Sequence, residues 1–200
     1  RRCNGIMTTA AWRIGKQVMN KRLEDLHIMI TGGSRGIGAA IVKKALAEGA
    51  RVSFIDIEQQ AGQDLVEQLS AGDQLFFAKC DIRSANDISR AHAAAVAKLG
   101  MVRGLVNNAG RNSYADPVTM SEAEWDDVFS VDLKSAWLMA RAVLPAMIAA
   151  KKGAIVNIAS VTGNEDELCT WLHDRYAERY PTVRIGDSLV VGAPKPGDEF

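Results

Sequence analysis

Short apolar runs alternate along the chain with longer stretches in which apolar residues recur every three or four positions. The first pattern is typical of buried strands and the second of helices that pack on one side. The runs that we interpret as strands cover residues 27–30, 51–55, 74–78, 104–106 and 154–158. Strand and helix in strict alternation predict an α/β fold with a doubly wound parallel sheet.

The predicted helices carry start and stop signals. Ser84 with Asp87, and Ser121 with Glu124, have the spacing of capping boxes at helix N-termini. Glycine follows the end of almost every predicted helix, where it commonly stops a helix. Further expectations for the helices are a bend at Pro145, an end at Gly153, and burial of Ile37, Ile41, Ala45 and Leu46.

Length and charge narrow the class of protein. The 200 residues are 48% apolar, which is enough for one domain with a substantial core. The 24 basic and 24 acidic residues cancel, so the excess positive charge expected of a nucleic-acid or anionic-membrane binder is absent. No apolar run reaches the ~18 residues of a membrane span. We therefore expect no nucleic-acid partner and no membrane partner.

The three cysteines bear on metal binding and on the cellular compartment. Cys3, Cys80 and Cys169 are odd in number, widely spaced and without a Cys-x-x-Cys pair. This pattern argues against a disulfide framework and against a zinc site. We expect no metal, and we interpret the protein as one of the reducing cytoplasm.

Residues 1–18 differ from the rest of the chain. Arg1, Arg2, Arg13 and Lys16 are basic, and no acidic residue precedes Glu24. We interpret this stretch as a leader or non-native segment that is disordered. Arg-rich, acid-poor segments also target proteins to organelles, so targeting is the alternative. The remaining chain divides by its pattern into a dinucleotide-binding domain over 19–164 and an off-pattern tail over 165–200.

A glycine-rich turn joins the first predicted strand to the first predicted helix. Gly32, Gly36 and Gly38 allow the backbone to turn sharply there and to approach a ligand closely. The free N–H groups at the start of the following helix favour a phosphate. Taken alone, the pattern is equally compatible with a plain tight connection between strand and helix.

Asp56 ends the second predicted strand, where a carboxylate can accept hydrogen bonds from both hydroxyls of an adenosine ribose. The same carboxylate would repel a 2′-phosphate. Arg35, inside the glycine turn, would instead favour NADP, because a guanidinium could pair with that phosphate. We predict NAD as the cofactor in preference to NADP. The alternative for Asp56 is a solvated loop acid.

Several motifs stand at predicted strand ends in a fixed order. They are the glycine segment 31–38, Asp56, Asp81-Ile82, Asn107-Asn108-Ala109-Gly110 and the strand end 158–160. Together they resemble the short-chain dehydrogenase/reductase family over about residues 21–164. The resemblance implies a Rossmann-like sheet, incomplete here on its C-terminal side. It also implies hydride transfer between a nicotinamide cofactor and a small-molecule alcohol or ketone.

The same resemblance implies roles for individual residues. Those expected on the pyrophosphate side of the cofactor are Gly32, Ser34, Arg35, Gly36, Ile37 and Gly38. Those expected to border the adenine or to support the cofactor and the central strand are Asp81, Ile82, Asn108, Ala109 and Gly110. Ser160 would orient the reacting oxygen of the substrate.

The acid–base pair of the family is missing. The family uses a tyrosine as general acid or base, with a lysine four residues later that lowers the tyrosine pKa. No tyrosine of this chain has lysine at that offset: Tyr176 is followed there by Tyr180, and Tyr180 by Arg184. His173 has Ala177 at the same offset, so we interpret it as a surface histidine.

Asp132 is a second departure, because the family places an asparagine of its proton relay at this position. An ionised aspartate only accepts hydrogen bonds, whereas asparagine also donates them. A relay through Asp132 would require rearrangement or a protonated carboxyl group. A tolerated family variant is the alternative.

We therefore expect a dehydrogenase whose cofactor half is intact but which, as the chain is given, is inactive. One alternative is a non-catalytic dinucleotide-binding protein that dimerises through the helices over 122–150, as the family does. Another is an aberrant product whose reading frame or splicing changes near Asn164.

In the tail we predict an amphipathic helix over 165–179 and extended runs over 182–185 and 188–191. The second run is expected to pair with the strand at 154–158 or to be disordered.

Overall fold

Strand and helix alternate in the order that the hydrophobic pattern predicts. The computed structural model describes residues 21–116, 118–159, 182–185 and 188–191. By their internal contacts the residues fall into two units, Arg1–Ile158 and Ala159–Phe200. The predicted leader over 1–18, the predicted helix over 165–179 and Ser160 lie outside the described residues.

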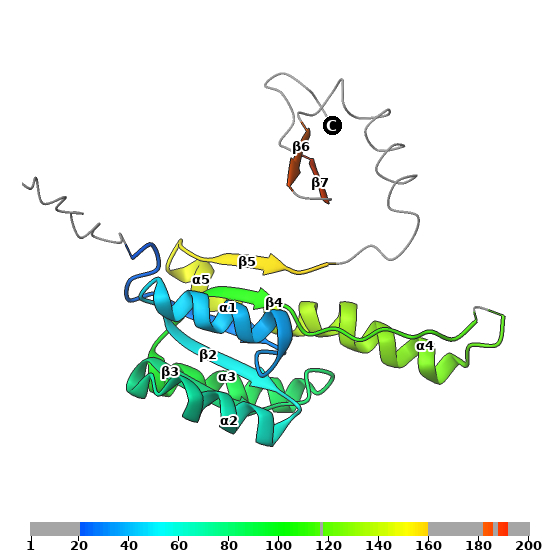
Figure 1. The fold of residues 1–200 in the computed structure, drawn as a ribbon, viewed down its shortest axis with the longest axis horizontal. Helices are drawn as coiled ribbons and strands as arrows, with labels where there is room; N and C mark the ends of the chain where they lie inside the picture. Colours follow the sequence, from blue (N-terminus) through cyan, green and yellow to red (C-terminus); the bar gives the residue numbers. More distant parts are fainter. Residues whose placement is uncertain (1–20, 117, 160–181, 186–187, 192–200) are drawn as a thin grey trace, which may run out of the picture. The chain divides into compact units, whose positions relative to one another are not determined.

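The first unit is built on one parallel sheet (Figure 1). Its strands are β1 (His27–Thr31), β2 (Arg51–Asp56), β3 (Leu75–Lys79), β4 (Val102–Asn107) and β5 (Ala154–Asn157). They lie in the order β3-β2-β1-β4-β5, and every neighbouring pair is parallel. The predicted doubly wound sheet is confirmed. All five strands therefore end at one edge, where ligands bind in folds of this kind.

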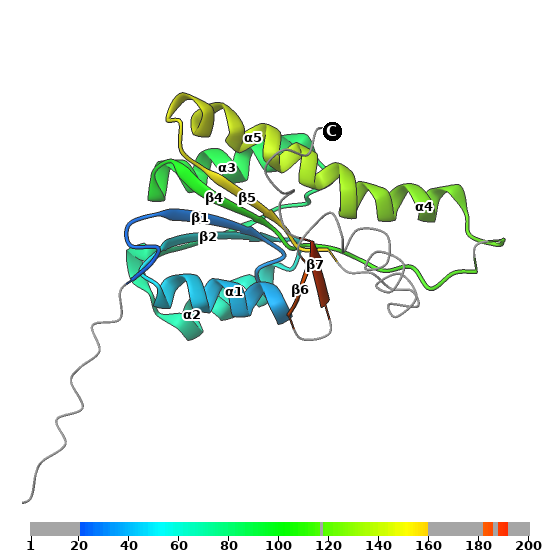
Figure 2. The same cartoon turned by 90° about the horizontal axis from the view of Figure 1, so that it is seen from above.

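Helices cover both faces of the sheet. They are α1 (Gly36–Ala47), α2 (Gln59–Leu69), α3 (Ala85–Leu99), α4 (Glu122–Phe129), a π-helical turn (Ser130–Lys134) and α5 (Ser135–Ala149). A 3₁₀ turn, η1 (Gly72–Gln74), precedes β3. α1 and α2 lie on one face of the sheet, and α3 and α5 lie on the other (Figure 2).

Each face has its own apolar core. Met29, Ile55 and Leu105 belong to the core that includes α3 and α5, whereas Ile30 and Phe54 belong to the core of α1 and α2. Strands buried on both faces have apolar residues at successive positions, which explains the continuous apolar runs in the sequence.

The face of α1 that packs on the sheet differs from the predicted one. Its buried residues are Gly38, Ala39, Val42 and Ala45. The prediction of a buried Ile37 is wrong, since this side chain is 66% exposed. Small residues allow a helix to approach a sheet closely, so the packing stripe follows them rather than the larger isoleucines. Of the four residues predicted to be buried, Ala45 is buried, and Ile41 and Leu46 are partly buried.

The serine half of each predicted capping box is confirmed. Ser84 Oγ accepts a hydrogen bond from the Asp87 N–H at 3.2 Å, and Ser121 Oγ accepts one from the Glu124 N–H at 3.2 Å. The acidic side chain of the second box has another partner, because Glu124 accepts a hydrogen bond from the Ser113 hydroxyl. These serines cap the N-terminal ends of α3 and α4.

The long helical stretch departs from the prediction at its end. Pro145 lies inside α5, which continues past it to Ala149. The prediction that Gly153 ends this helix is wrong, because Lys151 already takes a left-handed conformation with φ 51°. The irregular turn of the stretch is the π-helical segment between α4 and α5.

The second unit contains two described strands. β6 (Thr182–Ile185) and β7 (Ser188–Val191) pair antiparallel, with Val183 opposite Val190. The two predicted extended runs are confirmed. The prediction that 188–191 would pair with the strand at 154–158 or be disordered is wrong, because this run pairs with β6.

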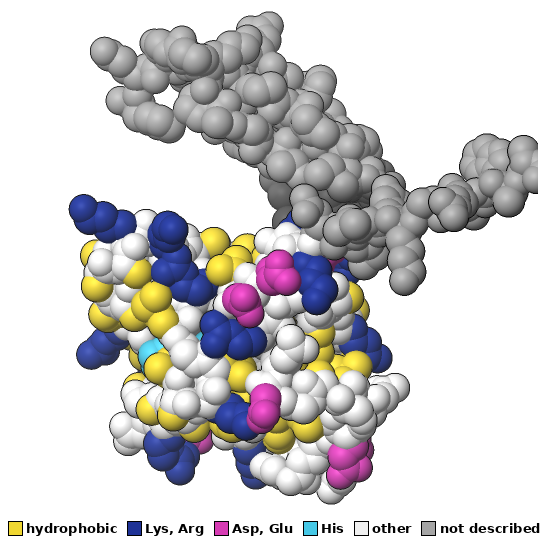
Figure 3. Space-filling model, turned by 90° about the vertical axis from the view of Figure 1, so that its left-hand side faces the viewer, with side chains coloured by type: hydrophobic (Ala, Val, Ile, Leu, Met, Phe, Trp, Pro, Cys, Tyr) yellow, Lys and Arg dark blue, Asp and Glu magenta, His cyan; other side chains and the backbone are white. Residues whose placement is uncertain are grey.

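No helix in the described part of the chain has the length and apolar character needed to cross a membrane. Seen from the amino ends of the strands, Lys and Arg side chains stand at separate points around the first unit, with Asp and Glu among them (Figure 3).

A buried histidine lies at the amino edge of the sheet, opposite the edge where the strands end. His27 is fully buried; its Nδ1 lies 2.6 Å from the Gly100 carbonyl oxygen and its Nε2 lies 2.8 Å from Ser53 Oγ. Burial lowers the pKa of His27, and the nearby charges of Arg51 and His92 lower it further, while the Gly100 carbonyl raises it. The neutral ring fits this site because a carbonyl and a hydroxyl satisfy both nitrogens.

We expect the free energy of unfolding to decrease as the pH falls below about 6.5. In that range the unfolded chain binds a proton at His27, whereas the lowered pKa keeps the folded chain neutral, so protonation favours unfolding. Urea unfolding at pH 7.5 and 5.5 measures the difference. His27→Gln should reduce this pH dependence, and His92→Gln should reduce it separately because burial also lowers the pKa of His92. A wild-type stability that is equal at both pH values would contradict the prediction.

Candidate functional site

The carboxyl ends of β1 and β4 are tied together by one threonine and one asparagine. Thr31 Oγ1 accepts hydrogen bonds from the N–H groups of Asn108 at 3.0 Å and Ala109 at 2.9 Å. Asn108 Nδ2 donates to the carbonyl oxygens of Thr31 at 3.0 Å and Gly32 at 3.2 Å. The turn after β1 is therefore held in place against β4.

Two glycines shape this turn. A Cβ on Gly38 would overlap the Gly32 carbonyl oxygen, so only glycine fits where α1 meets the turn. Gly36 has φ +53°, and a Cβ placed on it would meet nothing within 4 Å. The space beside the start of α1 is therefore open. Since no side chain caps α1 and no acid lies in its first turn, its free N–H groups and positive dipole end can receive an anion.

The carboxylate of Asp56 holds the turn from the end of β2. Its Oδ2 accepts a hydrogen bond from the Ser34 N–H at 3.0 Å, and its Oδ1 accepts one from the Glu58 N–H at 3.1 Å. Ser34 is only 7% exposed, and its Oγ has no hydrogen-bond partner among the residues that the structure describes. A buried hydroxyl without a partner beside free helix N–H groups fits a bound phosphate.

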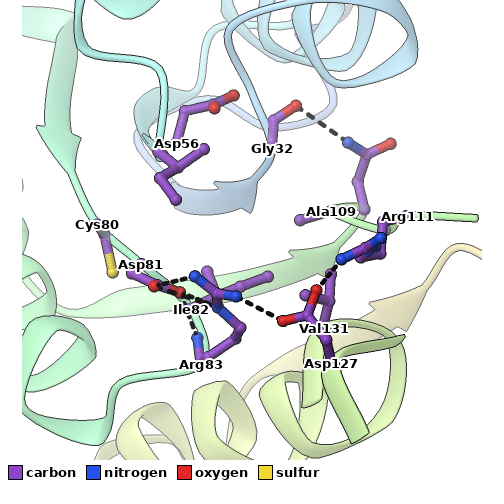
Figure 4. A pocket seen from close by; sticks show the side chains of 13 residues that line it. Gly32, Asp56, Cys80, Asp81, Ile82, Arg83, Ala109, Arg111, Asp127 and Val131 are labelled. Carbon is purple, nitrogen blue, oxygen red and sulfur yellow. Dashed lines mark hydrogen bonds and ion pairs between the residues drawn. The ribbon is translucent and has the colours of Figure 1, made fainter. Parts of the chain in front are cut away.

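A cavity of about 380 Å³ opens beside this turn (Figure 4). Seven residues predicted for the cofactor line it: Gly32, Asp56, Asp81, Ile82, Asn108, Ala109 and Gly110. The other lining residues are Ile57, Cys80, Arg83, Arg111, Asp127 and Val131. A volume of this size suits part of a nucleotide-sized ligand.

Four charged side chains form a chain of ion pairs along the cavity. Arg83 donates from Nε to Asp81 Oδ1 at 2.9 Å, from Nη2 to Asp81 Oδ2 at 2.7 Å and from Nη1 to Asp127 Oδ1 at 2.5 Å. Arg111 pairs with the other oxygen of Asp127. The hydrogen bonds from Arg83 lower the pKa of Asp81. Figure 4 shows this ion-pair chain on the side of the cavity opposite Asp56 and Gly32.

Comparison with known proteins gives the family. The profile of the short chain dehydrogenases matches residues 26–170, which is most of the chain. The chain belongs to the short-chain dehydrogenase family. Its five-stranded sheet with helices on both faces is therefore part of a known fold. The suspected family resemblance is confirmed.

Two relatives of known sequence are named as dehydrogenases. The "Probable galactose dehydrogenase GalD" of Rhizobium meliloti is 40% identical over 141 residues, 70% of this chain and 55% of that protein. The 2-(S)-hydroxypropyl-CoM dehydrogenase 3 of Xanthobacter autotrophicus is 38% identical over 148 residues, 72% of this chain and 57% of that protein. The chain thus spans little more than half the length of these relatives.

Solved structures of the family share the fold. A metagenomic short-chain oxidoreductase in complex with NADP has a TM-score of 0.66 and 33% identity, and the match covers 78% of each chain. A short-chain dehydrogenase/reductase from Brucella melitensis has a TM-score of 0.64 and 26% identity, covering 70% of this chain and 58% of that one.

Some residues predicted for the cofactor or substrate site lie outside the cavity lining. Ser34, Gly36 and Gly38 form the turn and the start of α1. Arg35 points to solvent, with its Nη2 3.9 Å from a carboxylate oxygen of Glu58. Ile37 lines an apolar groove between α1 and the β4–β5 side of the sheet. Ser160 lies outside the described residues.

The Asp132 carboxylate acts as a hydrogen-bond acceptor. Asp132, in the π-helical turn, accepts a hydrogen bond at Oδ1 from the Arg111 N–H at 2.9 Å. This is the acceptor role that an ionised carboxylate can fill.

Cys80 lines the cavity, but burial and the charges of Asp87 and Asp81 raise its pKa to about 12, so the thiol is not an activated nucleophile. Among the described residues, no three His, Cys, Asp or Glu side chains are grouped to hold a metal ion.

Sequence reasoning missed Arg83, Arg111 and Asp127. Arg83 directly follows Asp81-Ile82, and Arg111 directly follows the Asn-Asn-Ala-Gly segment. Their places beside two strand-end motifs were the available signal. Asp127 carried no such signal, because it lies on α4 among other acidic residues.

Proposed function

We propose that this chain binds a nicotinamide dinucleotide along the carboxyl edge of its sheet. The observation that carries the proposal is the open space at the uncapped start of α1, next to the buried Ser34 hydroxyl and the Asp56 carboxylate. The turn and the free N–H groups of α1 would hold the pyrophosphate. Asp81 and Ile82 would border the adenine, and the segment Asn108 to Gly110 would support the cofactor beside β4.

We further propose that the protein transfers hydride between this cofactor and a small-molecule alcohol or ketone. When bound, the cofactor supplies the hydride or accepts it. Ser160 would orient the reacting oxygen, and Asp132 would keep its acceptor role toward the Arg111 N–H. Because no tyrosine in the sequence has lysine four residues later, we propose that the chain as given binds the cofactor without turning it over. The three isolated cysteines support a cytoplasmic location.

A non-catalytic dinucleotide-binding protein that dimerises is the second candidate. It is favoured by an exposed apolar stripe along α4, the π-helical turn and α5, formed by Trp125, Phe129, Leu133 and Trp137. Assays of simple alcohols and ketones with NAD(H) test whether the chain as given turns the cofactor over. Turnover by the purified chain that Ser160→Ala abolishes would contradict the non-catalytic proposal.

The preferred cofactor is NAD, because Asp56 would face the adenosine ribose. Both Asp56 oxygens accept backbone N–H groups, and their remaining lone pairs can accept the two ribose hydroxyls. A 2′-phosphate would instead meet the negative charge of the same carboxylate. Arg35 is exposed, with its Nη2 3.9 Å from a carboxylate oxygen of Glu58, and could offset this repulsion. One solved relative contains NADP. Asp56 is fixed by two hydrogen bonds, so we give it the greater weight.

We expect the chain to bind NADH more tightly than NADPH. Asp56→Asn removes the negative charge together with one of the two backbone hydrogen bonds, and should reduce the ratio of NADH to NADPH affinity about tenfold. Titration calorimetry with both reduced cofactors measures the effect. Asp64→Asn is the matched control, since Asp64 is an exposed acid on α2 that bonds to Gln60. Tighter binding of NADPH by the unmodified chain would overturn the cofactor assignment.

A further inference from the structure

Arg83 is fixed in the cavity by carboxylates on two sides. Asp81 accepts hydrogen bonds from its Nε and Nη2, and Asp127 accepts one from its Nη1. All three guanidinium nitrogens therefore donate in the plane of the group, toward carboxylate oxygens. Two of its five N–H groups, one on Nη1 and one on Nη2, are left over, and the guanidinium also offers its flat face to a ligand in the cavity. A flat guanidinium face is a good stacking partner for a nucleotide base.

Charge balance argues against a second phosphate site at this wall. The ion-pair chain contains two guanidinium groups, Arg83 and Arg111, and two carboxylates, Asp81 and Asp127. Its formal charges cancel. The uncapped start of α1, which can receive the pyrophosphate, lies at the turn on the Gly32 side, whereas Arg83 lies across the cavity from Gly32 (Figure 4).

The neighbours of Arg83 also suit a planar ring. Ile82 is buried next to it in the chain, and Ile57 lies on the same cavity. Asp56, which would hold the ribose, is on the opposite side. A base attached to a ribose at Asp56 would extend over the cavity toward Ile82 and Arg83.

We propose that the Arg83 guanidinium stacks on the adenine ring of the dinucleotide, with Asp127 as the residue that positions it. This inference rests on the proposed function, since it assumes that a dinucleotide occupies the cavity. Through Asp127, α4 would help to position the group that contacts the adenine. The adenine is the part of the cofactor farthest from the site of hydride transfer. Arg83 thereby becomes a determinant of cofactor affinity that acts through the planar shape of its guanidinium.

The test is titration calorimetry with ADP-ribose and with NADH. Arg83→Met keeps the aliphatic stem but removes the plane, and Arg83→Lys keeps the charge but removes the plane. Both variants should bind ADP-ribose and NADH about tenfold more weakly than the unmodified chain. Asp127→Asn should weaken binding about threefold, and Asp127→Glu should restore most of the affinity.

Arg90→Met is the matched control, because Arg90 pairs with Asp87 at 2.6 Å and does not line the cavity. If Arg83→Met binds both ligands as tightly as the unmodified chain does, this inference is overturned but the proposed function is not. Full affinity in Arg83→Lys with loss in Arg83→Met would show that charge, not stacking, is responsible, and would also overturn it. If the unmodified chain binds neither ligand, the proposed function itself fails.

Discussion

Gly38→Ala is expected to abolish measurable NADH binding and to lower the free energy of unfolding by about 3 kcal/mol. A methyl group there would overlap the Gly32 carbonyl oxygen and lie 2.7 Å from Asn108 Nδ2. Neither atom can move freely, since Asn108 Nδ2 donates to the Gly32 carbonyl and the Asn108 N–H bonds to Thr31. Relief of the overlap would require α1 to move away from the turn, which would open the phosphate site.

Two other glycines separate the loss of binding from the loss of stability. Gly36 and Gly72 have nearly the same backbone conformation, with φ +53° and +56°, and a Cβ on either meets nothing within 4 Å. Alanine at each should cost about 1 kcal/mol of backbone strain. Only Gly36→Ala places its methyl group in the open space beside the start of α1, so only this variant should also weaken NADH binding.

Urea unfolding and titration calorimetry on the three variants provide both readouts. Gly72→Ala should match Gly36→Ala in stability and the unmodified chain in binding. Gly38→Ala protein that is folded and binds NADH with unchanged affinity would show that the turn does not hold the phosphate. Equal binding by Gly36→Ala and Gly72→Ala would show that the open space is not part of the site.

The strands β1, β2 and β4 could be predicted because most of their residues are buried. Their sequences are therefore mostly apolar, and their bounds differ from the predicted ones by only one or two residues. The packing face of α1 could not be predicted in the same way. Its contacts depend on how closely the helix approaches the sheet, which favours Ala39 and Val42 over the larger Ile37.

The two sides of the cavity differ in how far the sequence predicts them. Asp56, Asp81 and Asn108 follow strands directly, and parallel strands end at one edge, so their proximity follows from the strand order alone. The pairing of Arg83 with Asp127 joins a loop after β3 to a helix far along the chain. Charged residues at such positions usually face solvent, and only the tertiary fold shows that these two meet.

An apolar stripe runs along α4, the π-helical turn and α5. Trp125, Phe129, Leu133 and Trp137 recur at every fourth position and are between 42% and 64% exposed. The rings of Trp125 and Phe129 stack with centroids 4.4 Å apart. α4 also extends past the edge of the sheet, where another molecule can approach it (Figure 1). Large apolar residues gathered in this way are typical of a protein–protein interface.

We propose that this stripe joins two copies of the chain, and we expect Leu133→Glu to raise the dimer dissociation constant at least 100-fold. Leu133 is 64% exposed in the single chain, so glutamate is tolerated there by the folded protomer. In a dimer it would be buried without a partner, at a cost of about 3 kcal/mol, which corresponds to about 100-fold in affinity. Sedimentation velocity over a concentration series measures the dissociation constant.

Gln68→Glu, which adds the same charge at an exposed position of α2 on the other face of the sheet, should dimerise like the unmodified chain. A Leu133→Glu protein that sediments as the unmodified dimer, or an unmodified chain that stays monomeric throughout, would refute the role of the stripe.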